Sequence, residues 1–211
     1  RIDNVKVQVL PPTITFQDAE TFADGQANLL NGAQVGQWAM SSGLSPTRDV
    51  ATPNASLGFG VSNSGIALAA SSVLLFDTTV KATANGTSAG VVFDYYDAVN
   101  FKYAAVVAGT NQVVIGHHTK SGWTIDATVT QTVLAGKDYT LSLTLKGTTV
   151  SVLLLDPLAI VPGQPVAAVG YVFNAVVVDG QAGLFTRGGT SSFAGYTYKT
   201  DDSQFIPPPP P

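Results

Sequence analysis

The sequence predicts an all-β protein, a two-sheet antiparallel β-sandwich. The first observation is that residues 89–118 read as three strands separated by turns at 98–100 and 109–111, with aromatic and β-branched residues at alternate positions. The second is Tyr139–Leu145, where Tyr or Leu occupies every second position. The third is that no window has the spacing of an amphipathic helix. About twelve such strands with turns between them predict two stacked sheets.

Composition limits the function classes. The chain has 211 residues, 45% of them hydrophobic, which suits one large β domain. Cysteine is absent, which excludes thiol catalysis and cysteine-ligated zinc. The net charge is −4, so nucleic acid is not an expected partner. The basic residues are scattered and no apolar run reaches the length of a membrane span, so we expect no direct membrane insertion.

In the first half of the chain, strands are expected where alternating apolar residues stand between Pro, Gly, Asn or Asp. Pro11-Pro12 ends the first strand, and residues 41–64, rich in Ser, Pro, Asn and Gly, are expected to loop with short extended pieces. The expected strands are Ile2–Leu10, Thr13–Phe16, Trp38–Met40, Val73–Ala84, Gly90–Asp97 and Phe101–Val107.

In the second half, Gly109-Thr110-Asn111, residues 135–138 and Lys146-Gly147-Thr148 are the expected turns, and Pro157–Pro165 is an expected exposed loop. The alternation in Tyr139–Lys146 predicts a half-buried strand, and Phe93, Tyr103, Leu143 and Leu145 are expected core residues. The expected strands are Gln112–His118, Trp123–Val133, Tyr139–Lys146, Thr149–Asp156, Gly170–Val178, Gly183–Arg187 and Ser191–Lys199.

The two ends of the chain are similar to each other. Residues 2–7 align with residues 193–198, and both segments run into proline. We therefore divide the chain into an N-terminal strand and linker (1–12), a sandwich (13–200) and a proline-rich linker (201–211), and interpret it as one unit of a tandem array. The alternative is that residues 2–10 are simply the domain's first strand. If these residues belong to the sheet of a preceding copy, in the isolated unit they would pair with an open sheet edge of another molecule, with self-association through Ile2, Val5, Val7 and Val9.

The segments that carry a family resemblance span about residues 16–199. They are Phe16-x-Asp18, Phe22-x-Asp24-Gly25, Trp38, Ala89–Tyr96, Asn100–Tyr103, Asp138–Leu141, Gly147–Val152 and Ser192-Phe193. This pattern resembles concanavalin A-like jelly rolls of the laminin G type. More narrowly, Val92–Tyr96, Gly116-His117, Lys146–Val152, Val172–Ala175 and Lys199–Asp202 resemble tandem repeat modules of very large bacterial, planctomycete-like surface proteins. The resemblance implies an extracellular, cell-surface module, although this fold carries lectins, glucanases and spacers alike.

The densest acidic segment of the chain is a candidate calcium site. Asp18, Glu20 and Asp24 offer hard oxygens, and Asp18 and Asp24 are the candidate Ca²⁺ ligands. The alternative is a set of solvated turn carboxylates. Modules of the resembled family often place an acidic residue after the closing Phe, and this chain has Phe193-Ala194-Gly195 instead. A second departure is Leu158–Val166, where similar modules have a tighter turn. No cofactor is required.

An enzyme is not expected. Glucanases of the resembled fold place paired carboxylates two residues apart on one strand, whereas Asp94 and Asp97 are three apart and Glu20 is the only glutamate. Asp94 as a catalytic acid is therefore disfavoured. His117 and His118 are adjacent on a strand and point to opposite faces, so they do not share a metal.

A candidate ligand site follows from assigning the side chains of the strands at 90–97 and 101–107 to the two faces of their sheet. If Val91, Phe93, Tyr95, Phe101 and Tyr103 face the core, then Asp94, Tyr96 and Lys102 share the opposite face and could bind a sugar by stacking and hydrogen bonding. The alternative is that this face is covered by other parts of the chain or is solvated. Trp38 and Trp123 are expected to be packing residues rather than sugar-stacking platforms. We expect a non-catalytic extracellular structural or adhesive repeat, whose partners are neighbouring repeats or identical subunits. The alternative function is a carbohydrate-binding module, with glycans as partners.

Overall fold

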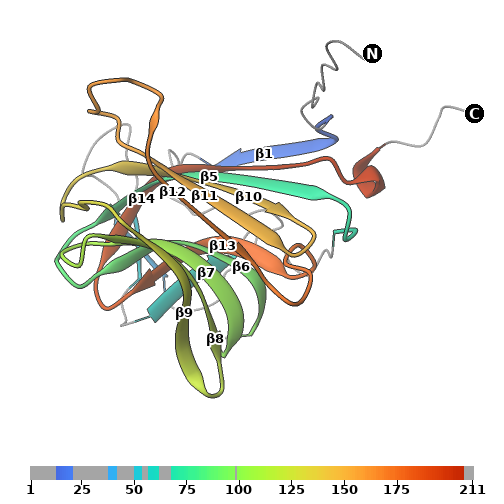
Figure 1. Cartoon of the computed structure of the whole chain (residues 1–211), viewed down its shortest axis with the longest axis horizontal. Helices are drawn as coiled ribbons and strands as arrows, with labels where there is room; N and C mark the ends of the chain where they lie inside the picture. The colour runs from blue at the N-terminus through green and yellow to red at the C-terminus, as the bar shows by residue number, and fades with distance from the viewer. Residues whose placement is uncertain are drawn as a thin grey trace, which may run out of the picture.

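The computed structural model describes residues 13–20, 38–41, 50–53, 57–61, 68–97 and 99–206. These residues form a two-sheet antiparallel β-sandwich, as the alternation predicted, and it is a concanavalin A-like jelly roll, as the family resemblance implied. In Figure 1 one sheet lies above the other. The only helical element in the described ranges is one 3-10 turn, Ser203–Phe205. No helix in them has the length and apolarity that a membrane crossing needs.

Each large sheet has six strands. The first has the order β1-β14-β5-β10-β11-β12 and the second the order β4-β13-β6-β7-β8-β9, while β2 and β3 form a separate pair. The strands are β1 (Phe16–Glu20), β2 (Trp38–Ser41), β3 (Val50–Pro53), β4 (Leu57–Val61), β5 (Val73–Ala82), β6 (Ser88–Asp97), β7 (Asn100–Val107), β8 (Gln112–Thr119), β9 (Gly122–Thr130), β10 (Tyr139–Lys146), β11 (Thr149–Leu155), β12 (Pro165–Val172), β13 (Gln181–Arg187) and β14 (Ser191–Thr200).

Two strands are displaced from their expected positions, and the first is β1, which was expected over Thr13–Phe16 and is Phe16–Glu20. For the second, the sequence predicted a loop over 157–165 and a strand over 170–178, but β12 is Pro165–Val172 and the chain is irregular from Phe173 to Gly180. Pairing explains the shift, because β12 follows β11 in register from Leu155↔Pro165 to Thr149↔Val172. The Ala and Gly residues of β12 have low strand propensity, so the neighbouring strand decides where β12 begins and ends.

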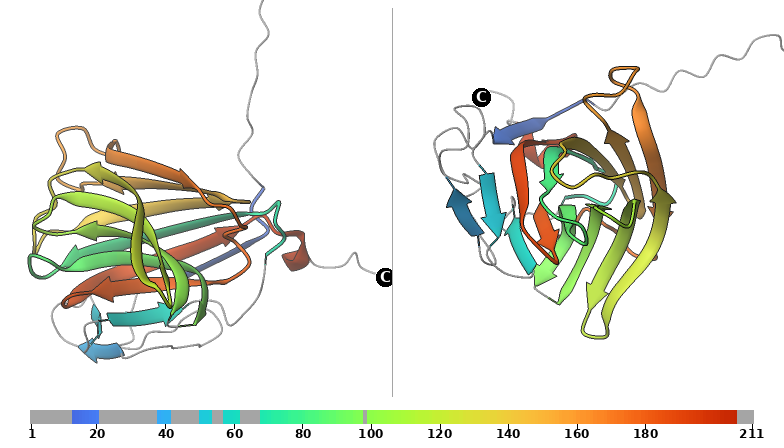
Figure 2. Two further views of the ribbon diagram at one scale, coloured as in Figure 1. Left: turned by 60° about the horizontal axis from the view of Figure 1, so that its bottom comes forward. Right: turned by 90° about the vertical axis from the view of Figure 1, so that its left-hand side faces the viewer.

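The main core lies between the two sheets, which are visible as separate layers in Figure 2. The predicted core residues Phe93, Leu143 and Leu145 are buried in it, and the predicted Tyr103 is buried elsewhere. The largest fully buried side chains of this core are Phe76, Phe93, Ile115, Leu141, Leu143, Leu145, Leu154, Leu184 and Phe193. Seven strands from the two sheets contribute them, so the core ties both sheets together.

A second apolar cluster fills the other face of the second sheet. Its buried members are Val92, Tyr95, Phe101, Tyr103, Ala105, Val114 and Phe185, with Trp123 packed against them. The Trp123 and Phe185 rings are 5.9 Å apart, although β6, β7 and β8 separate their strands. In a flat sheet, four strand spacings would put the two strands roughly 19 Å apart. The second sheet is therefore strongly curled, with this cluster on its concave side.

The expected relation between the faces of β6 and β7 is wrong. Val91 and Phe93 lie in the main core, as predicted, but Tyr95, Phe101 and Tyr103 lie in the concave cluster. Alternation is preserved along β7, and along β6 as far as Phe93. The register pairs Phe93 with Lys102, so Lys102 shares the face of Phe93 rather than the opposite face. Relative to β13, a bulge between Val92 and Tyr95 then adds one residue to β6, and Tyr95 lies on the concave side.

The chain remains packed on the sandwich beyond Thr200, in a segment that the sequence assigned to the linker. Asp202 is 2% exposed, and its carboxylate accepts hydrogen bonds from Ala69 N (2.7 Å), Ser72 Oγ (2.9 Å) and Gln204 N (2.9 Å). Burial alone would raise the pKa of Asp202, but these hydrogen bonds outweigh it and lower that pKa. Phe205 stacks on Phe16 of β1 at 4.6 Å. Residues 201–206 therefore anchor the end of β14 to the sandwich.

Candidate functional site

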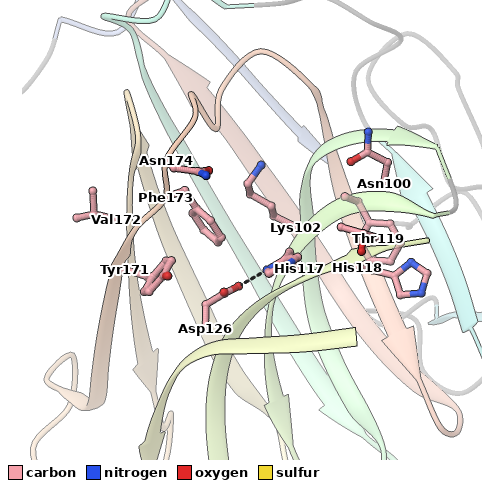
Figure 3. Close-up of a pocket in the computed structure, with 11 residues that line it drawn as sticks. Asn100, Lys102, His117, His118, Thr119, Asp126, Tyr171, Val172, Phe173 and Asn174 are labelled. Atoms are coloured by element: carbon pink, nitrogen blue, oxygen red, sulfur yellow. Dashed lines mark hydrogen bonds and ion pairs between the residues drawn. The ribbon is translucent and has the colours of Figure 1, made fainter. Parts of the chain in front are cut away.

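A pocket of about 500 Å³ opens between the two sheets, at one end of the sandwich (Figure 3). One wall comes from β7, β8 and β9, and the other from the end of β12 and the two residues after it. This volume is in the range of small-molecule sites. The lining residues are Asn100, Phe101, Lys102, His117, His118, Thr119, Asp126, Tyr171, Val172, Phe173 and Asn174. We call this cavity the inter-sheet pocket.

A buried ion pair lies at the base of the pocket. Lys102 donates to Asp94 Oδ2, with their side chains 16% and 3% exposed. The Lys102 ammonium also lies 5.2 Å from the centre of the Phe173 ring, a cation–π contact with the opposite wall. Lys102 therefore links the two walls, and Asp94 compensates its charge from behind.

Asp94 owes its position to the bulge in β6. Its backbone has φ +46°, a left-handed conformation that is uncommon for a residue with a side chain. The backbone of Gly180 packs directly on it, because a Cβ on Gly180 would lie 2.6 Å from Asp94 Cα. The second carboxylate oxygen, Oδ1, is buried without a hydrogen-bond partner of normal geometry. Burial raises the pKa of Asp94, and the Lys102 hydrogen bond and charge only partly oppose this.

Tyr96 is the third residue of the predicted sugar-binding set. Its side chain is exposed at the end of β6, and its hydroxyl interacts with the carboxyl groups of Asp94 and Asp179. Burial of the hydroxyl and these two carboxylates raise the pKa of Tyr96. The structure thus brings Asp94, Tyr96 and Lys102 together, but on the inter-sheet side of β6 and β7 and through a bulge.

A histidine–carboxylate pair stands beside Lys102. His117 Nδ1 is 2.7 Å from Asp126 Oδ2, across β8 and β9. Asp126 occupies the extra position of a bulge in β9, which turns it toward His117. His118 behaves as predicted for an adjacent strand residue, because its ring stacks on Phe101 and Trp123 of the concave cluster. Burial lowers the pKa of His118, and the positive charge of Arg187 adds to this.

The aromatic wall of the pocket was not predicted. Tyr171 and Phe173 pack edge to face at 4.8 Å, and Phe173 also contacts Phe93 of the main core. Asn174 extends this wall and is exposed. Sequence reasoning missed these residues because it placed them inside a later strand. The only sequence signal was the cluster Tyr171-Val172-Phe173-Asn174, two aromatic residues followed by an amide.

The other predicted sites lie outside the described side chains. Asp18 pairs with Tyr198 through the backbone of β1 and β14, but its carboxylate and Asp24 are not described. Among the described residues, no group of three or more His, Cys, Asp or Glu could hold a metal ion. Ile2, Val5, Val7 and Val9, the predicted self-association residues, also lie outside the described ranges.

Comparison with known proteins supports the fold. No protein-family model matches the chain, and no curated protein matches it at a significant level. The carbohydrate-binding module CBM66 from Bacillus subtilis aligns with TM-score 0.56 and 18% identity, over 75% of this chain and 88% of the module. The VIP36 exoplasmic/lumenal domain in its Ca²⁺/Man-bound form aligns with TM-score 0.52 and 10% identity, over 77% of this chain and 80% of that domain.

A longer enzyme also contains a similar structure. Xylan β-1,4-xylosidase from Bacillus halodurans C-125 aligns with TM-score 0.60 and 13% identity, over 94% of this chain and 41% of the enzyme. The present chain therefore spans less than half of that protein. At these identities the likeness establishes the β-sandwich fold.

Proposed function

We propose that the protein is a non-catalytic carbohydrate-binding module and that the inter-sheet pocket holds the sugar. The observation that carries the proposal is the composition of this pocket, in which the aromatic wall of Tyr171 and Phe173 faces Lys102 and His117 across about 500 Å³. Sugar rings present an apolar C–H face for stacking and hydroxyl groups for hydrogen bonds. The similar structures named as a carbohydrate-binding module and as a Man-bound domain support the same proposal.

The pocket is preorganised for such a ligand. Lys102 is held by Asp94, and His117 is held by Asp126 at 2.7 Å, so neither side chain needs to be ordered on binding. Holding polar groups in place before binding reduces the entropic cost of association. We further propose that the module acts outside the cell, where polysaccharides are available to it.

The first prediction is that pocket variants lose glycan binding while they remain folded. His117→Ala and Asn174→Ala each remove a polar group from the pocket lining, and we expect affinity to fall about tenfold, which corresponds to about 1.4 kcal/mol. Thr130→Ala is the matched control, because Thr130 is exposed at the far end of β9 and outside the lining. Calorimetric titration with the best ligand of a glycan array measures the change. Equal affinity in all three variants would place the sugar elsewhere.

The second prediction is that no glycan is hydrolysed. Paired carboxylates on opposite sides of a bond carry out glycoside hydrolysis, and the carboxylates at this pocket are instead engaged with Lys102 and His117. Incubation with β-glucans and xylans should release no reducing sugar above background. Release that Asp94→Asn abolishes would show that Asp94 is a catalytic acid.

The third prediction concerns the structural or adhesive repeat role, which rests on residues 2–10 and 207–211. Residues 2–10 carry five apolar side chains that suit strand addition to an open sheet edge, so we expect concentration-dependent association of the full chain. Sedimentation of the full chain and of a variant without residues 1–10 measures it. Unchanged association after the deletion, or a full chain that stays monomeric, contradicts this role.

A further inference from the structure

Each basic side chain at the inter-sheet pocket that faces the space between the sheets is bound to a carboxylate of the protein. Lys102 is bound to Asp94, and His117 is bound to Asp126. His118 contributes to the lining but stacks on Phe101 and Trp123 on the far side of the sheet. Among the described lining residues, no other side chain is a Lys, Arg, Asp or Glu. The pocket therefore presents no cation without a carboxylate in contact with it.

These carboxylates weaken the binding of an acidic ligand. A uronic acid carboxylate that approaches Lys102 or His117 meets the carboxylate of Asp94 or Asp126 behind it, and like charges at short range repel. Proteins that bind anions instead direct several cations at the ligand. A neutral sugar loses nothing from this arrangement, because its hydroxyl groups carry no charge.

The uncharged groups of the pocket suit hydroxyl groups. Asn100 and Asn174 offer both donors and acceptors, and Thr119 offers a hydroxyl. In the tautomer that donates from Nδ1 to Asp126, His117 Nε2 is an acceptor, and it has no partner among the described residues. Lys102 supplies further N–H donors. The pocket lining therefore offers both hydrogen-bond donors and acceptors, as a polyhydroxyl ligand requires.

We infer that the inter-sheet pocket selects neutral sugars and discriminates against acidic ones, an inference that rests on the proposed carbohydrate-binding function. Specificity arises from the internal ion pair Lys102–Asp94 and from the Asp126 carboxylate that is hydrogen-bonded to His117. Tyr171 is only partly buried and can stack on the sugar ring without regard to its charge, while the buried Phe173 supports Tyr171 edge to face. The ligand class is thus an uncharged oligosaccharide.

The experiment titrates the full chain with two sets of probes at low and high salt. The neutral set is xylo-, gluco- and manno-oligosaccharides together with α-1,4-linked galacto-oligosaccharides, and the acidic set is oligogalacturonates, which differ from the last of these by the carboxylate on each unit. We expect a neutral probe to bind with an affinity that changes less than about twofold between about 0.05 and about 0.5 M NaCl. We expect oligogalacturonates to bind at least about tenfold more weakly than that neutral probe, a difference of about 1.4 kcal/mol.

A charge variant tests the physical cause. Asn174→Lys places a cation without a carboxylate partner at the exposed edge of the pocket, and we expect it to strengthen oligogalacturonate binding about tenfold at low salt. Thr130→Lys adds the same charge outside the pocket and should not do so.

The outcomes separate the inference from the proposed function. Tighter binding of oligogalacturonates than of every neutral probe, with steep salt dependence, overturns the inference and leaves a carbohydrate-binding module. Equal gains in Asn174→Lys and Thr130→Lys also overturn it, because the pocket would then not control charge selection. Failure of both probe sets to bind overturns the proposed function and the inference together.

Discussion

Replacing Leu143 by alanine is expected to lower the free energy of unfolding by about 2–5 kcal/mol. Leu143 is 1% exposed in β10, in the middle of the first sheet, and its neighbours in register are Phe76 of β5 and Val152 of β11. All three side chains belong to the core between the sheets. The smaller side chain loses its transfer free energy and leaves a cavity that strands fixed on both sides cannot close.

Equilibrium denaturation in urea measures this loss, and Thr144→Ala is its control. Thr144 is adjacent in β10 but faces solvent, so the change should cost less than about 1 kcal/mol. A loss below about half a kcal/mol for Leu143→Ala would mean that the alternation along β10 has been assigned to the wrong face.

Replacing Lys102 by methionine is expected to cost about 3–5 kcal/mol near pH 7. Methionine preserves much of the side-chain volume but leaves the Asp94 carboxylate, which is 3% exposed, without its cation. Oδ1 of this carboxylate already lacks a hydrogen bond of normal geometry, so the variant would bury a charge with little compensation. The double variant Asp94→Asn/Lys102→Met should recover most of the loss, because no charge remains buried.

The loss of stability in Lys102→Met should decrease as the pH is lowered. Burial raises the pKa of Asp94 in the folded protein, and removing Lys102 raises it further, because the lysine hydrogen bond and charge lower it. A carboxyl group whose folded-state pKa is raised destabilises the fold above that pKa, and the penalty disappears as pH falls through it. Lys102→Met should therefore be closer to wild type in stability near pH 4.5 than near pH 7. An equal loss at both values would show that the charge of Asp94 is not the cause.

The two faces of β6 and β7 show how far sequence reasoning reached at the site. Alternation alone grouped Asp94, Tyr96 and Lys102, and the structure does bring them together. The grouping assumed that the two strands keep a common phase and that Phe101 and Tyr103 share the face of Phe93. The register Phe93↔Lys102 contradicts that assumption. Since a bulge at Asp94 adds one residue to β6 relative to β13, Asp94 and Tyr96 lie on the inter-sheet side of the strand. Alternation along the sequence does not predict such an extra residue.

The second wall of the pocket shows a different limit. Tyr171, Phe173 and Asn174 stand about fifty residues or more from Lys102 and His117 in the chain. They meet because β12 is at one edge of the first sheet and β9 at the corresponding edge of the second, and the two edges approach at this end of the sandwich. Propensity within residues 165–180 could not predict this meeting, because pairing with β11 decides where β12 ends.

The sequence by itself determined what depends on neighbouring residues. Alternating side chains with Gly, Asn and Pro at the turns specify strands, and their apolar faces require two sheets around a common core, as Tyr139–Lys146 illustrates. The tertiary structure alone decided strand register, the bulges at Asp94 and Asp126, and the curl that brings Trp123 to Phe185. These features arise from the packing of strands distant in sequence. A shift of one residue there costs nothing in local propensity but moves a side chain to the other face of the sheet.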